Sequence, residues 1–474
     1  MTLTIPRSQL KEALAGLSKV VNQRASIPIL ACVRIDAEGK TARLTGTSID
    51  QTAVYEITVA EPVPAPVSVL IPIDALQAVL KTAQGPEIEI QPGKDAVTLT
   101  ATVAGQNIGR RVETSDIKDW PELAVPADTK PVEPSFLPSL RQALMFASTD
   151  DSRPLLKSAY LDVDAKKGHR IVATDSRRLS VFPCGILPLA ESAIVPSTRF
   201  LNWSKLEGET RIGTSKGVFT LRCGPWTYTA KTVEGQYPRW SQVVSAYGGD
   251  RTLELSPEDA VMLIKALPGL PAYDNSHEAV VLHMDGNAVR VFSRQDSKSP
   301  ESAVRLESSR HEGKGVFSIG LNREFFRDAL QAGFRYWEFQ DAVSPLLGRL
   351  AKDDKASIHV LMPIRTIDAE VQRTEAKAPE AKPAPVPVQS QPIQKEATMP
   401  KKIEEPQTVA PEAPTSLDRI LSAYELAKDA VRQANNALAD VAQCVRDAIK
   451  EDRARRKEIA DVRSGLAKLQ AIRV

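Results

Sequence analysis

Residues 7–21, RSQLKEALAGLSKVV, contain the pattern that decides the fold. Apolar side chains recur there at the three- and four-residue spacing of one helix face, at Leu10, Leu14, Leu17, Val20 and Val21. An alternating run with Val33 and Ile35 follows, and Glu38-Gly39 is typical of a hairpin turn. The order predicts a helix followed by a β-hairpin.

The same pattern returns twice further along the chain. Helical patterns recur at about 137–147 and 255–267, and each precedes alternating strands around a turn, Lys167-Gly168 or Asp285-Gly286. Each of the three units then has a second helical pattern, at 73–80, 200–206 and 321–330. Recurrence at an interval of about 120 residues predicts three similar α+β domains in tandem.

Composition divides the chain further. We expect domains at 1–125, 126–248 and 249–367, with Pro121 and Pro126 at the first boundary and Gly248 and Gly249 at the second. Residues 368–414 are rich in Pro, Ala, Glu and Lys, which predicts a disordered linker because such a segment buries little apolar area. Helical spacing resumes in 415–474 with an interrupted apolar seam, which indicates a coiled coil or a helical hairpin.

The overall charge excludes a simple electrostatic argument for DNA binding. Among 474 residues, 61 Lys and Arg face 59 Asp and Glu, so any attraction to nucleic acid depends on how charge is distributed. The four cysteines form no CxxC pair, which argues against zinc and disulfides. Neither a leader pattern nor a long apolar run is present, so we expect a cytoplasmic protein.

Catalytic motifs are missing from the sequence. It contains no phosphate loop, no GxGxxG, no HExxH and no GxSxG, and its five histidines lie on separate segments. The sequence therefore predicts a protein that is not an enzyme and needs neither a cofactor nor a metal. A hydrolase or nuclease would have to assemble its acids or histidines from distant segments, and metal-dependent turnover of DNA would reveal it.

Several short motifs stand out along residues 1–367. The clearest is IVATDSRRLSVF at 171–182. The others are RASIPILACV at 24–33, LTGTSID at 44–50, EGQYPRW at 234–240 and HVLMPIR at 359–365. In this order and register they resemble one family, the beta sliding clamps of bacterial replicative DNA polymerase.

The resemblance implies a DNA replication factor. Two copies would join head to tail in a ring around duplex DNA, and short linear motifs would attach the polymerase and the clamp loader. Positive side chains on the helices would face the DNA without reading its sequence. The candidate DNA-binding residues are Lys19, Arg24, Lys81, Arg141, Arg199, Lys205, Lys265, Arg323 and Arg327.

The family's partner-peptide pocket can be matched residue by residue. The matching positions are Leu156, Thr174, Ser176, Arg177, Arg178, Leu179, Pro238, Gln242, Val243, Val360, Met362, Pro363, Ile364 and Arg365. Three of them depart from the usual pattern. Ser176 and Arg177 stand where Gly and His are usual, and Gln242 stands where Arg is common. The departures predict a bulkier and more cationic rim.

The dimer interface implied by the family joins a first-domain strand to a third-domain helix. Its residues here would be Gln106, Ile108, Arg110, Leu267 and Leu270. Arg110 stands where an apolar residue is expected, and the chain continues for over a hundred residues beyond the family's usual end. A second hypothesis is therefore a non-replicative clamp paralogue, a scaffold with an oligomerising or docking coiled coil.

Overall fold

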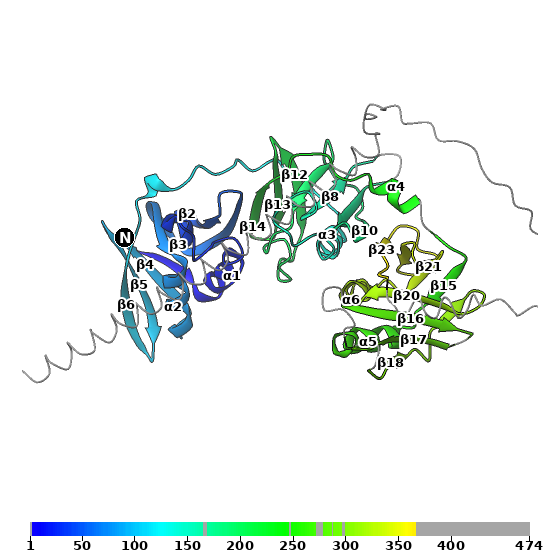
Figure 1. The fold of residues 1–474 in the computed structure, drawn as a ribbon. Coiled ribbons are helices and arrows are strands. Elements are labelled where there is room, and N and C mark those ends of the chain that lie inside the picture. Colours follow the sequence, from blue (N-terminus) through cyan, green and yellow to red (C-terminus); the bar gives the residue numbers. More distant parts are fainter. Residues whose placement is uncertain are drawn as a thin grey trace, which may run out of the picture. The chain divides into compact units, whose positions relative to one another are not determined.

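The structure is a computed structural model. It describes residues 2–164, 168–245, 248–271, 278–286, 288–295 and 299–365, and the predicted linker and C-terminal helical segment lie outside these ranges. The described residues form three α+β domains in tandem, as predicted (Figure 1). No helix among them is both long and apolar enough to cross a membrane.

The first domain contains two helices that pack against its strands. Helices α1 (Arg7–Leu17) and α2 (Ile73–Thr82) contact each other, and both apolar faces are buried as their spacing predicts. Four strands form one sheet in the order β1-β4-β5-β6, while β2 and β3 pair as long antiparallel strands. The strands are β1 (Leu3–Pro6), β2 (Cys32–Thr47), β3 (Gln51–Pro72), β4 (Glu87–Pro92), β5 (Ala96–Val103) and β6 (Gln106–Glu113), and short 3-10 turns lie at Pro28–Ala31 and Ile117–Asp119.

The prediction of a hairpin turn at Glu38-Gly39 is wrong. Strand β2 continues through it to Thr47, and its register with β3 shifts on both sides of Gly39. Gly39 has a φ of 56°, which glycine adopts without a steric penalty, so these residues form a bulge inside the strand. The actual turn lies at residues 48–50, where the Ser48 N–H donates to the Gln51 carbonyl.

The second domain begins with a two-residue strand and contains one long helix. The helix, α3 (Phe136–Leu144), follows the predicted apolar pattern. A short helix, α4 (Trp240–Ser245), ends the domain. The strands are β7 (Lys130–Pro131), β8 (Ser158–Asp162), β9 (Arg170–Thr174), β10 (Arg178–Pro183), β11 (Ala193–Pro196), β12 (Thr210–Ser215), β13 (Val218–Cys223) and β14 (Trp226–Lys231).

A second helix was expected at 200–206, and the segment forms only turns. The Asn202 N–H reaches the Thr198 carbonyl, but the next bonds span only three residues. The Asn202 side-chain amide also donates to the Thr198 carbonyl and to Ser197 Oγ. Asparagine side chains that bond to nearby backbone groups compete with helix formation, which accounts for the difference. Phe200, Leu201 and Leu206 are nevertheless fully buried.

The third domain repeats the pattern of the first. Helix α5 (Pro257–Ala266) begins with Ser256, whose side chain accepts from the Asp259 N–H, and α6 (Arg323–Gln331) begins with Asn322 in the same role. The two helices contact each other, and a 3-10 turn follows α5 at Leu267–Gly269. The strands are β15 (Arg251–Glu254), β16 (Ala279–Asp285), β17 (Ala288–Ser293), β18 (Ser302–Arg305), β19 (Arg310–Glu312), β20 (Phe317–Asn322), β21 (Tyr336–Phe339), β22 (Leu346–Arg349) and β23 (Ile358–Leu361).

Two sheets continue from one domain into the next. A six-stranded sheet, β2-β3-β14-β13-β12-β7, joins the first domain to the second through the β3–β14 pair. A nine-stranded sheet, β11-β8-β9-β10-β23-β22-β21-β15-β19, joins the second to the third through β10 and β23. Figure 1 shows β3 beside β14. Backbone hydrogen bonds therefore cross both domain boundaries.

Side chains reinforce the first of these junctions. The Trp226 ring lies against Tyr55 with centroids 4.6 Å apart and edge to face. It also lies so close to α1 that a β-carbon added at Gly16 would be 2.3 Å from Trp226 Cη2. The Tyr228 hydroxyl lies 2.9 Å from both Gln51 Oε1 and Thr198 Oγ1. Residues of the first domain thus complete the core of the second.

Candidate functional site

An apolar patch lies where β10 of the second domain pairs with β23 of the third. Leu179 and Val360 are partners across this pair, and both side chains are buried. They belong to one apolar cluster with Val172 and Leu347. At the surface, Met362 directly after β23 is 43% exposed and Val243 on α4 is 38% exposed. We call these six residues the β10–β23 patch.

Other predicted pocket residues surround the patch in different ways. Leu156, Pro363 and Ile364 are half-buried, and Thr174 is buried. Pro238 and Gln242 line a cleft of about 690 Å³, whose walls also include Tyr160, Tyr237 and Trp240. The structure thus divides the predicted pocket residues between the patch at the β10–β23 junction and a cleft lined only by second-domain residues.

The turn between β9 and β10 is fixed by its own hydrogen bonds. Thr174 Oγ1 donates to the Arg178 carbonyl at 2.6 Å and accepts from the Ser176 N–H. Asp175 Oδ1 accepts from the N–H groups of Arg177 and Arg178. The Arg177 carbonyl accepts from the Met362 N–H at 3.0 Å, which ties the turn to the chain that follows β23.

Ser176 adopts a strained conformation in this turn. Its φ is 78°, a region that side chains other than glycine enter at a cost of about 1 kcal/mol or more. The family's usual glycine would enter it freely. The departure noted in the sequence therefore changes the energy of the turn as well as its bulk.

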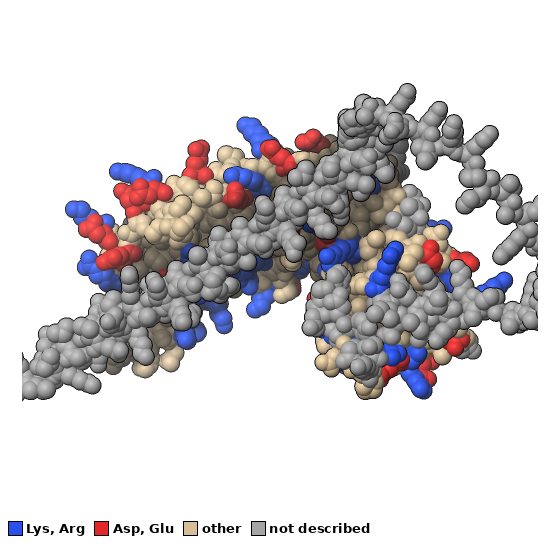
Figure 2. Space-filling view, viewed as in Figure 1, with Lys and Arg blue, Asp and Glu red and all other residues tan. Residues whose placement is uncertain are grey.

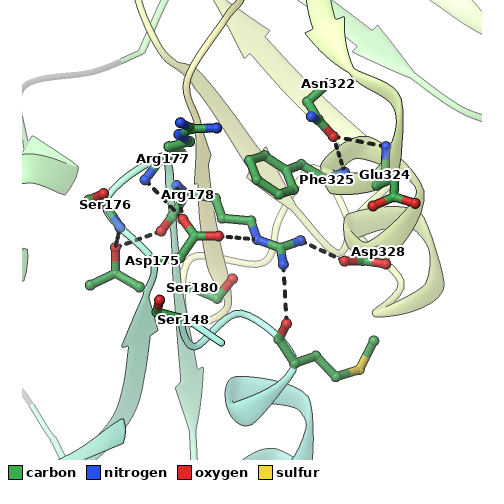
Figure 3. A network of polar contacts seen from close by, with 12 residues as sticks. Ser148, Asp175, Ser176, Arg177, Arg178, Ser180, Asn322, Glu324, Phe325 and Asp328 are labelled. Atoms are coloured by element: carbon green, nitrogen blue, oxygen red, sulfur yellow. Dashed lines mark hydrogen bonds and ion pairs between the residues drawn. The ribbon is translucent and has the colours of Figure 1, made fainter. Parts of the chain in front are cut away.

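Arg178 joins the second domain to α6. Its guanidinium is 8% exposed and pairs with Asp175 Oδ2 at 2.9 Å and with Asp328 Oδ2 at 2.7 Å (Figure 3). A third bond reaches the Met145 carbonyl, and the guanidinium lies 4.3 Å from the Phe325 ring centroid. Arg178 is therefore occupied in holding the junction.

A buried histidine lies beside this network. His359 on β23 is completely buried, and its Nδ1 lies 2.6 Å from Ser180 Oγ on β10. Phe146, Phe334 and Trp337 surround the ring. Burial, with a smaller contribution from the Arg178 charge, lowers the pKa of His359 to about 3. The ring is neutral near pH 7 and has a packing role.

Two arginines at the patch do not hold the junction together. Arg177 and Arg365 are exposed, and neither side chain bonds to another described residue. In Figure 3 the Arg177 guanidinium points away from the Asp175–Arg178–Asp328 contacts. Arg177 and Arg365 are therefore two exposed cations at this junction, and the backbone of Arg177 is bonded to that of Met362.

The predicted DNA-binding residues fall into two groups. Arg24, Lys81, Arg199, Lys205 and Lys265 are exposed, and Lys19 is half-exposed. Figure 2 shows Lys and Arg gathered along the side of the first domain where α1 and α2 lie. These side chains can bind phosphates without further rearrangement.

The other three candidates are engaged within the protein. Arg141 donates to the carbonyls of Trp203 and Leu206, and burial lowers the pKa of its guanidinium. Arg323 pairs with Glu278 at 2.7 Å and donates to the Leu270 carbonyl. Arg327 is half-buried, with its Nη2 4.0 Å from Asp328. Sequence spacing placed them on helices but could not show these contacts.

The predicted interface residues also differ in their exposure to solvent. Strand β6 ends its sheet and is exposed along nearly its whole length, with Ile108 at 52%. Gln106 and Arg110 are exposed too. Leu267 and Leu270 are instead buried in the core, at 0% and 8%, so neither can offer a surface to a partner. Val261 and Met262 on α5 are the exposed apolar groups nearby, at 52% and 38%.

Known proteins match this chain along most of its length. Residues 1–123 match the model for the N-terminal domain of the DNA polymerase III beta subunit. The beta sliding clamp of Pseudomonas putida is 26% identical over 387 residues, which cover 77% of this chain and all of that protein. The beta sliding clamp of Caulobacter vibrioides is 26% identical over 402 residues, with the same coverage.

The chain is similar to the beta sliding clamps over most of its length. Solved clamps share the fold: the DNA polymerase III beta subunit of Pseudomonas aeruginosa superposes with a TM-score of 0.66 at 21% identity, over 77% of this chain and 100% of that one. The clamp of Bartonella birtlesii bound to griselimycin gives 0.66 at 22% identity with the same coverage. The three tandem domains thus have the fold of the solved clamps.

Some residues near the site carried no recognisable signal in the sequence. Asp328 meets Arg178 across 150 residues of sequence, and nothing in its own segment indicates that contact. Met145, 40% exposed, was also missed. Its carbonyl accepts from Arg178 because α3 ends at Leu144, inside the helical pattern predicted at 137–147. Among the described residues, no three His, Cys, Asp or Glu side chains gather as metal ligands.

Proposed function

We propose that the chain is a DNA sliding clamp, a non-catalytic processivity factor that encircles duplex DNA and tethers a replicative polymerase. The observation that carries the proposal is the match of three consecutive clamp domains to the full length of named sliding clamps. We expect the protein to act in the cytoplasm, with a clamp loader and other partners competing for the β10–β23 patch.

Ring closure would use two free sheet edges. Strand β6 ends the first-domain sheet and β18 ends the β18-β17-β16-β20 sheet of the third domain. A second copy placed head to tail can add β18 to β6 and so continue the sheet, as β3–β14 and β10–β23 do inside the chain. Ile108 would meet the exposed Val261 and Met262, while Leu267 and Leu270 support α5 from the core.

The DNA contacts would be general rather than sequence-specific. Exposed Arg24, Lys81 and Lys265 can each neutralise a phosphate, and such contacts weaken as salt rises. A clamp needs attraction that permits sliding, so a modest number of flexible cations suits it better than base readout. Arg141 and Arg323 would support the fold.

Topological linkage to DNA tests this function. One cysteine placed in β6 and one in β18 of the full chain would allow a bifunctional thiol reagent to close the ring after incubation with circular plasmid. A clamp remains on the circle after a high-salt wash and leaves when a restriction enzyme linearises the plasmid. Equal retention on linear DNA, or none on circles despite cross-linking, would contradict encirclement.

A further inference from the structure

The charges around the β10–β23 patch are unevenly balanced. Asp175 and Asp328 are both occupied by Arg178, and Asp328 also faces Arg327. Two carboxylates and two guanidiniums thus balance one another. Arg177 and Arg365 are left over as exposed cations, and no described acidic side chain pairs with either.

The backbone of Arg177 is held in place. Its N–H donates to Asp175 Oδ1 at 2.9 Å, and its carbonyl accepts from the Met362 N–H at 3.0 Å. Its neighbours Ser176 and Arg178 are bonded in the same turn. The guanidinium therefore projects from a fixed base whose backbone is bonded to that of the exposed Met362.

An exposed arginine next to an apolar patch has a specific chemical preference. The guanidinium binds a carboxylate through two parallel N–H···O bonds, and an apolar surface beside it lowers the local dielectric and strengthens them. Methionine adapts to different apolar side chains, so the patch can receive several sequences. Both features favour a short peptide that combines an apolar anchor with an acid.

We propose that Arg177 is a specificity-determining residue, which selects partner peptides with a carboxylate next to the apolar residue that seats against Met362. The inference deepens the proposed function and depends on the patch being the partner site. With the family's usual histidine at this place, mostly neutral at pH 7, the preference for an acid would be weaker.

The experiment starts from a random heptapeptide display library selected on the full chain. Peptides that bind the M362D variant are removed, which keeps those that use the patch. One selected acidic heptapeptide and its amide analogue, Asp→Asn or Glu→Gln, are then titrated by fluorescence anisotropy. The proteins are the unchanged chain and the variants Arg177→Ala, Arg177→Lys and Arg222→Ala, each checked by thermal melting.

Arg222 on β13 is the matched control, because it is also an exposed arginine without a described partner and lies in the other sheet. We expect the acidic peptide to bind the unchanged chain and the R222A variant about fivefold more tightly than its amide analogue. The difference should vanish in R177A, survive in part in R177K, and shrink in high salt.

Two failures can be told apart. Heptapeptides that depend on Met362 but show no preference for acid, or whose preference survives in R177A, would overturn the role of Arg177 and leave the partner site standing. A library that yields no Met362-dependent peptide would overturn the partner site, and this inference with it.

Discussion

Ser176 adds backbone strain to a turn that its hydrogen bonds otherwise stabilise. The bonds from Thr174 and Asp175 fix the turn around it. Its φ of 78° forces the β-carbon towards the neighbouring backbone. The turn persists because the junction on either side of it is well bonded.

Replacing Ser176 with glycine should therefore stabilise the protein. We expect the free energy of unfolding to rise by about 0.5 to 1 kcal/mol, because relief of strain exceeds the entropy that glycine adds to the unfolded chain. Urea titration measures the difference. Ser176→Ala is the control and should bring no gain, since it keeps the β-carbon. A destabilised glycine variant would mean that the hydroxyl has a role in the turn.

His359 gives the fold a dependence on acid. Its pKa is about 3 in the folded protein and about 6.5 in an unfolded chain, so the unfolded state binds more protons between these values. Stability is fully present above pH 6.5 and is lost as the pH falls through this window, by at most about 1.4 kcal/mol per pH unit. Urea titrations from pH 7 to 4.5 should show a shallower slope for His359→Gln than for the unchanged chain. Equal slopes would show that the ring does not titrate as its burial indicates.

At the level of elements, α1 is fitted to the second domain through Gly16. Alanine is normally better than glycine inside a helix by about 1 kcal/mol. At this position the new β-carbon would lie 2.3 Å from Trp226 Cη2 and 2.8 Å from Trp203 Cζ3. The steric clash should outweigh the helix propensity.

We expect Gly16→Ala to lower the free energy of unfolding by about 1 to 3 kcal/mol, the range for overpacked cores. Combining it with Trp226→Leu provides the control, because the smaller side chain makes room. In that background the alanine should cost less, because only the close approach to Trp203 Cζ3 remains. Denaturant titration of the four proteins measures the free energy of unfolding. An equal loss of stability in both backgrounds would mean that the clash with Trp226 is not the cause.

The sequence predicted some elements well because their signals are local. The apolar spacing of α1 and α5 and the cap residue of α6 all lie within one helix. Glu38-Gly39 was misread because the same dipeptide serves a turn or a bulge, and only the long partner strand β3 decides between them. Residues 200–206 kept the apolar pattern without the helix, because Asn202 bonds to its own backbone.

The site was predictable only in part, for the same reason. Similarity to a family located Leu179, Val360 and Met362 together. The pairing of Arg178 with Asp328 depends on the assembled β10–β23 junction, and no short-range pattern encodes it. The burial of Leu270 likewise arises from packing of the third domain and is invisible in the apolar pattern.

At the scale of the whole molecule, the free edge of β6 should control self-association. We expect Ile108→Lys to halve the mass measured by light scattering at micromolar concentration, because a buried lysine at the sheet junction has no partner acid. Val125→Lys is the control, an equal change at a side chain that is 82% exposed. Loss of the dimer in both variants would point to net charge instead of the edge.

The contribution of residues 368–474 to self-association can be tested with two forms of the protein. Residues 1–367 and the full chain should both be dimeric in light scattering if the two sheet edges close the ring. A monomeric short form with an associated full chain would mean that residues 368–474 drive assembly. The scaffold hypothesis would then replace the replicative one.

The β3–β14 pair also has a consequence for synthesis on the ribosome. Residues 51–55 of β3 find their partners at 226–230, so the strand leaves the ribosome long before β14 exists. At about 5 to 20 residues per second the wait is on the order of ten to thirty seconds. Throughout that time a hydrogen-bonding edge and the space for Trp226 stand open. The nascent first domain is thus a transient target for chaperones, and slow translation of residues 100–220 should increase its aggregation.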